Sequence, residues 1–125
     1  MIPIEDISGQ AFHTTTSVDA GAVQVVLRGN ADIAALPGLE KYLKKLHQEI
    51  GRLRYPLVTV DIRELYFMNS SCLKTLVTWI TTVGDAGKAE RYRIKFVSNA
   101  NLHWQRRSLG ALKNLGNDTV EVVAA

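Results

Sequence analysis

Hydrophobic and polar positions change their spacing within one central stretch of the chain, residues 58–82. The stretch opens with a β-branched run, passes a polar turn and reaches Tyr66-Phe67-Met68, which is followed by Asn69-Ser70-Ser71. From there the apolar residues recur every three or four positions, as on one face of a helix. They are Leu73, Leu76, Val77 and Ile80. The pattern predicts a strand and then a helix, with a serine pair at their junction.

The beginning of the chain predicts a hairpin and a first helix. Residues 1–10 show little pattern and are expected either to fray or to form an edge strand. Two β-branched runs, residues 11–18 and 23–27, flank a turn and predict paired strands. The polar run 28–32 is expected to break the second strand, with Asp32 capping a helix that Gly51 ends. The core-facing stripe of that helix is Leu39, Leu43, Leu46 and Ile50.

The rest of the chain alternates strands with helices. The near-continuous apolar run 57–61 predicts a strand that is buried on both faces, and the helix after the serines is expected to end near Val83-Gly84. A strand over 92–97, a helix over roughly 101–109 and a last strand over 119–123 follow. This order predicts a single α/β domain over 1–125, with a mixed β-sheet of about five strands, an N-terminal hairpin and about three covering helices.

Composition narrows the class of protein. The 125 residues are 46% hydrophobic and 22% charged, and the net charge is +3, far from the dense basic stripe of a nucleic-acid binder. Cys72 is the one cysteine. An internal disulfide therefore cannot form, and the sequence has no pair of cysteines of the kind that binds zinc. No apolar run approaches the roughly 18 residues of a membrane span, and the first residues lack the order of a signal peptide. A cytoplasmic protein without metal, cofactor or membrane contact is expected.

Ser70 and Ser71 lie where a helix would begin. The first turn of a helix leaves backbone N–H groups unpaired and carries a partial positive charge, so it accommodates a phosphate or another anion. Serine is also common at helix starts simply because it caps them. Ser71 is expected to be structural, with a hydrogen bond to the first turn. Position alone leaves both roles open for Ser70.

Two other groups of residues suggest different chemistry. Cys72 could be a reactive thiol, because a helix N-terminus lowers the pKa of a cysteine. An enzyme would also need a base, and nothing ties a histidine to Cys72, so a buried apolar role is expected and enzymatic activity is not. Trp104, Arg106, Arg107 and Lys113 could bind nucleic acid weakly, or they form the outside of the third helix, which is the preferred interpretation.

Residues 61–73, DIRELYFMNSSCL, resemble the central motif of the STAS domain, which is typified by bacterial anti-sigma factor antagonists. Members of that family carry an Asp, then a Leu or Val, then Phe-Met-Asp-Ser-Ser-Gly-Leu. The run Leu27-Arg28-Gly29-Asn30-Ala31-Asp32 is similar to the family's Leu-x-Gly-x-Leu-Asp segment before the first helix. Asn69 and Cys72 stand where the usual motif has Asp and Gly, which is similar to a variant group with Phe-Met-Asn-Ser-Ser-Cys.

The resemblance implies a non-enzymatic regulator of partner switching in signal transduction and transcription. An anti-sigma factor that is also a serine kinase would phosphorylate Ser70, the first serine of the pair, and a phosphatase would reverse the modification. Asn69, Ser70, Ser71 and Lys74 would form the docking surface. The alternative is an unphosphorylated scaffold subunit of a signalling assembly. The oligomeric state stays open.

Overall fold

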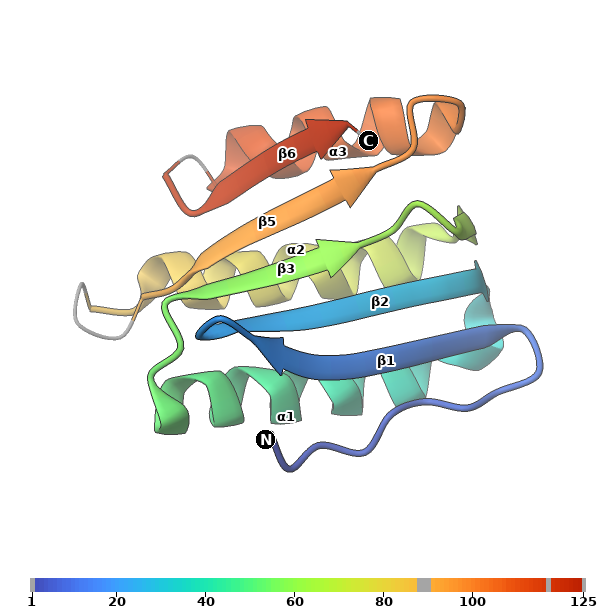
Figure 1. Cartoon of the computed structure of the whole chain (residues 1–125). Helices are drawn as coiled ribbons and strands as arrows, with labels where there is room; N and C mark the ends of the chain where they lie inside the picture. The colour runs from blue at the N-terminus through green and yellow to red at the C-terminus, as the bar shows by residue number, and fades with distance from the viewer. Residues whose placement is uncertain (1, 88–90, 117, 125) are drawn as a thin grey trace.

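A mixed sheet with helices behind it forms the architecture of the computed structural model, which describes residues 2–87, 91–116 and 118–124 (Figure 1). The strands are β1 Phe12–Asp19, β2 Ala22–Ala31, β3 Leu57–Asp61, β4 Leu65–Met68, β5 Arg93–Ser98 and β6 Val120–Ala124. The helices are the 3-10 turn η1 Ile33–Ala35, then α1 Leu36–Leu53, α2 Ser70–Asp85 and α3 His103–Gly116. The predicted α/β class, with an N-terminal hairpin and three α-helices, is confirmed.

The sheet has the order β1-β2-β3-β5-β6, and β4 pairs with the end of β2. β1 and β2 are antiparallel, whereas the pairs β2–β3, β2–β4, β3–β5 and β5–β6 are parallel. The three α-helices all lie behind this sheet in chain order, and α2 contacts both of the others (Figure 1). Each parallel crossover therefore returns over the same face.

Rows of apolar side chains across the strands make the helix-facing side of the sheet. Val25 lies beside Val60, and Val60 beside Phe96; these three side chains are almost completely buried. The other face carries no helix (Figure 1), and on it Thr59 is only partly buried. The prediction that the third strand is buried on both faces is therefore wrong, since helices cover one face only.

The second strand does not break where the sequence suggested. β2 runs on to Ala31 because β4 supplies a second parallel partner for its end, after a register shift between Gly29 and Asn30. Gly29 has φ +95, and a Cβ there would lie 2.0 Å from the carbonyl oxygen of Ala11. Only glycine fits this irregular position. A residue that looks like a strand breaker therefore allows the strand to continue.

The helix ends differ from the predictions where core contacts extend the helix. Asp32 accepts a hydrogen bond from the Ala34 N–H at 3.0 Å and caps η1 rather than α1 itself. α1 passes the predicted cap Gly51 and ends at Leu53, with Arg54 as its C-cap at φ 59 in the left-handed region. α3 continues beyond residue 109 because Leu112, 1% exposed, keeps its apolar stripe in the core. α2 ends at Asp85, close to the predicted end near Val83-Gly84.

The N-terminal segment, residues 2–10, follows the outer edge of β1 and the flank of α1 (Figure 1). The Thr14 N–H donates to the Ile7 carbonyl at 2.9 Å, and the Asp6 carboxylate accepts the Thr16 N–H at 3.2 Å. Ile2 is buried. The segment is thus held in place rather than frayed; it makes one isolated bridge, between Ser8 and His13, and no strand. Within these described ranges, no helix is both long and apolar enough to cross a membrane.

Candidate functional site

The serine pair lies where β4 ends and α2 begins. The Asn69 N–H donates to the Ala31 carbonyl at 2.9 Å, which fixes the junction to the end of β2. The Asn69 side-chain oxygen then accepts the Cys72 N–H at 2.8 Å, and Asn69 is the N-cap of the helix. This satisfies one of the free amide groups of the first turn. The sequence predicted the junction and placed the cap within this motif.

Ser70 is the first residue of α2 and is exposed, whereas Ser71 is only partly so. Among the described residues, the Ser71 hydroxyl makes no hydrogen bond, so the predicted bond to the first turn is wrong because Asn69 already provides the cap. Lys74 is exposed and lies four residues after Ser70, on the same helix face. The structure therefore brings an exposed hydroxyl, free amide groups and a cation to one helix end.

Large apolar side chains also reach solvent around this junction. Among the described residues, those classed as exposed are Ile33 at 66%, Tyr66 at 55%, Phe67 at 47% and, elsewhere, Leu115. Phe67 pairs with Asn30, while the Asp32 carbonyl, next to Ile33, accepts a hydrogen bond from the Cys72 thiol at 3.4 Å. We call Ile33, Tyr66, Phe67, Ser70 and Lys74 the junction surface.

Sequence reasoning found Tyr66 and Phe67 as an apolar step but did not predict that they are exposed. Strand alternation could have shown that one of them is exposed, because consecutive residues point to opposite faces; that both are exposed, between buried Leu65 and Met68, departs from this alternation. Ile33 gave no such signal, because its exposure depends on a short 3-10 turn before α1.

Cys72 is completely buried inside the same junction. Burial above all, and then the carboxylates of Asp32 and Glu40, raise the pKa of its thiol. A thiol with a raised pKa is protonated at neutral pH and is a poor nucleophile. The side chain therefore fills core space, as the preferred interpretation of the sequence had it.

The cationic residues of α3 do not surround a free aromatic face. The Trp104 indole N–H donates to the Leu65 carbonyl at 3.1 Å, and the buried Gln105 amide donates to the same oxygen at 3.1 Å. Both side chains thus attach α3 to β4. Arg106, Arg107 and Lys113 are exposed, which fits the outside of a helix. In the part of the chain that the structure describes, no cluster of His, Cys, Asp or Glu could hold a metal ion.

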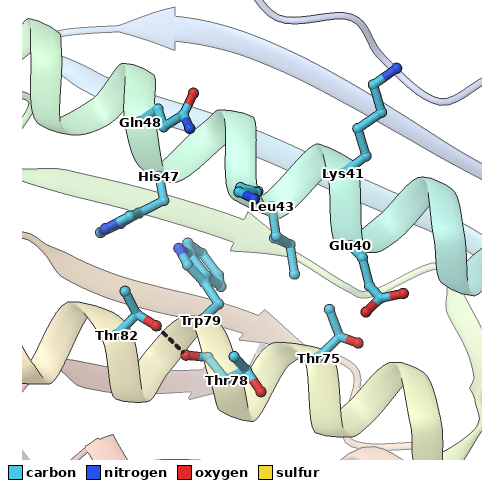
Figure 2. Close-up of a pocket in the computed structure, with 10 residues that line it drawn as sticks. Glu40, Lys41, Leu43, His47, Gln48, Thr75, Thr78, Trp79 and Thr82 are labelled. Carbon is cyan, nitrogen blue, oxygen red and sulfur yellow. Dashed lines mark hydrogen bonds between the residues drawn. The ribbon is translucent and has the colours of Figure 1, made fainter.

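A groove of about 760 Å³ separates α1 from the later turns of α2 (Figure 2). Its lining includes Leu43, His47 and Trp79. Behind it the Tyr92 hydroxyl accepts the Trp79 indole N–H at 2.8 Å and lies 2.8 Å from His47 Nδ1. An indole N–H can only donate, so the tyrosine oxygen accepts this bond, while the direction of the bond between Tyr92 and His47 depends on the imidazole tautomer. Burial lowers the pKa of His47 and raises that of Tyr92. No pattern in the sequence indicates this cluster.

Comparisons with known proteins place the fold. No protein-family model matches the sequence, and no curated protein matches it. The solved structures that match include an anti-sigma factor antagonist from Mycobacterium paratuberculosis, with TM-score 0.65 and 18% identity over 92% of this chain and 90% of that one. They also include the Bacillus cell fate determinant SpoIIAA in its phosphorylated form, with TM-score 0.56 and 17% identity over 90% and 91% of the two chains. The fold of this chain is therefore STAS-like.

Proposed function

We propose that this chain is a non-enzymatic protein-interaction module that acts as an anti-sigma factor antagonist, or as a related component of a partner switch, with Ser70 as its phosphoacceptor. The observation that carries the proposal is the junction surface. It combines an exposed serine at a helix N-terminus with three large apolar side chains that are 47–66% exposed, Ile33, Tyr66 and Phe67. Exposed apolar clusters of this kind mark protein interfaces. The STAS-like fold agrees with this role.

The switch would work through the chemistry of one hydroxyl. With Ser70 unmodified, a partner buries Ile33 and Phe67 and contacts Asn69, Ser70, Ser71 and Lys74. Phosphorylation adds roughly two negative charges, which the first turn of α2 and Lys74 can hold locally. The partner would then have to desolvate a dianion in the middle of an apolar contact, which opposes binding. The phosphate thus stabilises the free protein relative to the complex.

The partner that fits this scheme is a cytoplasmic anti-sigma factor of the serine-kinase type, with a phosphatase to restore Ser70. Asn69 keeps the helix capped as an aspartate would, but it carries no charge beside the phosphoacceptor. We therefore expect a kinase that recognises Ser70 without an acidic neighbour on its amino side. Cys72 is buried and takes no part in the recognition.

Variants of Ser70 test the switch on the full chain. The partner is recovered from the native host with Ser70→Ala as bait, and its affinity for each variant is then measured by calorimetry. Ser70→Ala should bind as the wild type does, and Ser70→Asp should bind at least about tenfold more weakly, a change of roughly 1.4 kcal/mol. Thr81→Asp is the matched control, because it places the same charge on an exposed position of the same helix, away from the junction.

Intact mass of the protein from its native host separates the switch from the scaffold subunit. The switch predicts a fraction that carries one phosphate, located on Ser70 by fragmentation. Equal affinities for wild type, Ser70→Ala and Ser70→Asp, together with no phosphorylated fraction under any growth condition, would reject the switch and leave the scaffold.

A further inference from the structure

The sheet ends in two different edges. The edge of β1 is covered by the N-terminal segment, through the Thr14 and Thr16 N–H groups described above. At the other end, β6 pairs with β5 and has no second partner among residues 2–87, 91–116 and 118–124 (Figure 1). An edge strand presents a row of N–H and C=O groups to any extended chain that can lie beside it.

The direction of these groups follows from one hydrogen bond. The Ile94 N–H donates to the Thr119 carbonyl at 2.8 Å, and Ile94 pairs with Val120 in a parallel register. In a parallel pair every second residue bonds to the neighbouring strand. Glu121 and Val123 therefore face β5, whereas Val120, Val122 and Ala124 direct their backbone groups outward. β6 contains neither lysine nor proline, the usual residues that block an edge.

A shallow hollow of about 360 Å³ accompanies this edge, between β6 and α3. Its β6 side is Val122 and Ala124, and its α3 side includes Leu109 and Gly110. A Cβ placed on Gly110 would meet nothing within 4 Å, so the space above it is open. The lining continues past the ends of the two paired strands, to Asn99 and Ala100 directly after β5.

The positive charge beside the hollow favours an acidic binding partner. Arg106 and Lys113 line it, both are exposed, and neither is in an ion pair with any described residue. Glu121, the acid of β6, is already paired with Arg93 at 3.3 Å. We propose that the β6 edge binds an extended acidic segment of a partner protein, which adds to the sheet as a further strand and places its carboxylates against Arg106 and Lys113.

A second copy of this chain fits the same edge less well. Two β6 strands paired antiparallel are related by a two-fold axis perpendicular to the sheet, so both α3 helices would lie on the same side of the joined sheet. Arg106 and Lys113 of one copy would then face those of the other. Like charges brought together oppose the pairing, whereas an acidic segment meets complementary charge. This inference does not depend on the junction surface or on Ser70.

A designed peptide of alternating valine and glutamate, labelled with a fluorophore, is the probe. It should bind the full chain in low salt, as measured by fluorescence anisotropy, and a valine–lysine peptide of equal length should not. Arg106→Glu with Lys113→Glu should weaken binding about tenfold or more, since two exposed charge contacts are reversed. Both positions are exposed on α3, so the double variant should keep the fold.

Amide hydrogen exchange identifies an added strand. The peptide should slow exchange at Val120, Val122 and Ala124, whose N–H groups point outward, and leave Glu121 and Val123 unchanged, because these already bond to β5. Val122→Pro removes an outward donor without removing a bond to β5 and should abolish peptide binding. Circular dichroism shows whether this variant folds. If it does not, the Arg106→Glu, Lys113→Glu double variant still tests whether the peptide binds at this edge.

Several results would overturn the inference. They are no binding of the acidic peptide, equal binding of the two peptides, protection of β6 amides that already bond to β5 instead of Val120, Val122 and Ala124, and displacement of the peptide by random single-stranded DNA at lower concentration than by unlabelled peptide. A dimer of the free protein in sedimentation that Val122→Pro dissociates would also overturn it, because the occupant would then be a second copy.

Discussion

The two ends of α2 differ in how far the side chains around them are buried. At its start, Ser70 is exposed and Ile33 and Phe67 stand in solvent. Near its other end, Trp79 is 4% exposed and its indole is hydrogen-bonded to Tyr92, which also meets His47. Apolar surface that a protein leaves exposed contributes nothing to folding and is available to a partner. The comparison suggests that the late turns of α2 hold the fold together and leave the first turn free to bind.

Substitutions should then divide between the two ends. A change near Trp79 should lower the free energy of unfolding, and a change at Ser70 should leave it nearly constant while partner affinity changes.

Trp79→Ala should destabilise the protein by about 3–5 kcal/mol, because it removes a large buried side chain that links α2 to α1 and to Tyr92. Urea denaturation followed by circular dichroism gives the value. Phe67→Ala is the matched control, since it removes an aromatic side chain that is 47% exposed at the other end and should cost far less. Similar losses from both variants would contradict the division.

Tyr92→Phe should cost about 1–3 kcal/mol, since a buried indole N–H loses its acceptor and His47 Nδ1 loses its hydrogen-bond partner while the ring volume stays. The same denaturation experiment measures it. Tyr66→Phe serves as its control: that ring is 55% exposed, and the loss of its hydroxyl should be within experimental error. If Tyr92→Phe is as mild as Tyr66→Phe, the shared hydrogen bonds do not stabilise this end.

Asn69→Ala should cost about 1 kcal/mol, the usual value of a helix N-cap. This is the one sizeable effect expected at the exposed end, and it tests how far the division extends. Asn69→Asp keeps the acceptor for the Cys72 N–H and should retain the stability. A neutral Asn69→Ala would mean that the bond from Asn69 to the Ala31 carbonyl alone holds the junction.

Acid should weaken the late turns of α2 through His47. Its folded pKa lies below the ordinary value near 6.5 because burial opposes the charged form. Tyr92 is its hydrogen-bond partner, and the charged residues that line the two hollows beside it are Glu40, Lys41, Lys44, Arg52, Arg54 and Arg91. A lowered folded pKa means that the neutral form favours the native state. Its contribution is present above the unfolded pKa near 6.5 and is lost as the pH falls through the folded value.

Unfolding measured at pH 7.5 and at pH 5 should therefore show a smaller loss of stability in acid for His47→Gln than for the wild type. His13→Gln, at an exposed position of β1, should lose as much as the wild type does. Equal pH dependence of wild type and His47→Gln would show that other groups govern the acid response.

Ser70→Ala should change the free energy of unfolding by less than about 0.5 kcal/mol, as exposed positions usually do. Among the described residues, the first turn is capped by Asn69 and not by this hydroxyl. A loss above 1 kcal/mol, which the same urea titration would detect, would make Ser70 a structural residue.

Features of the α/β fold and of the site that depend on local sequence were predictable, whereas those that depend on contacts between distant segments were not. The junction at residues 69–72 was predicted because it depends on a local change of hydrophobic period, from the tip of β4 to the stripe of α2. The continuation of β2 was missed because Gly29 resembles a local breaker, and only β4, more than 30 residues later, completes its pairing. Tyr92 was missed because the residues that define its role, His47 on α1 and Trp79 on α2, are distant from it in the sequence. Local residue spacing carries no information about such tertiary contacts.

The covered edge of β1 also limits how large an assembly can grow. A sheet with two open edges can add copies at both and extend into a fibre, whereas a sheet with one can be joined once only. The N-terminal segment, held by the Asp6 carboxylate and the Ile7 carbonyl, thus prevents a further strand from pairing with β1. Two copies of this chain joined at β6 would each present a covered β1 edge at the far end, so the joined sheet would not add a third copy.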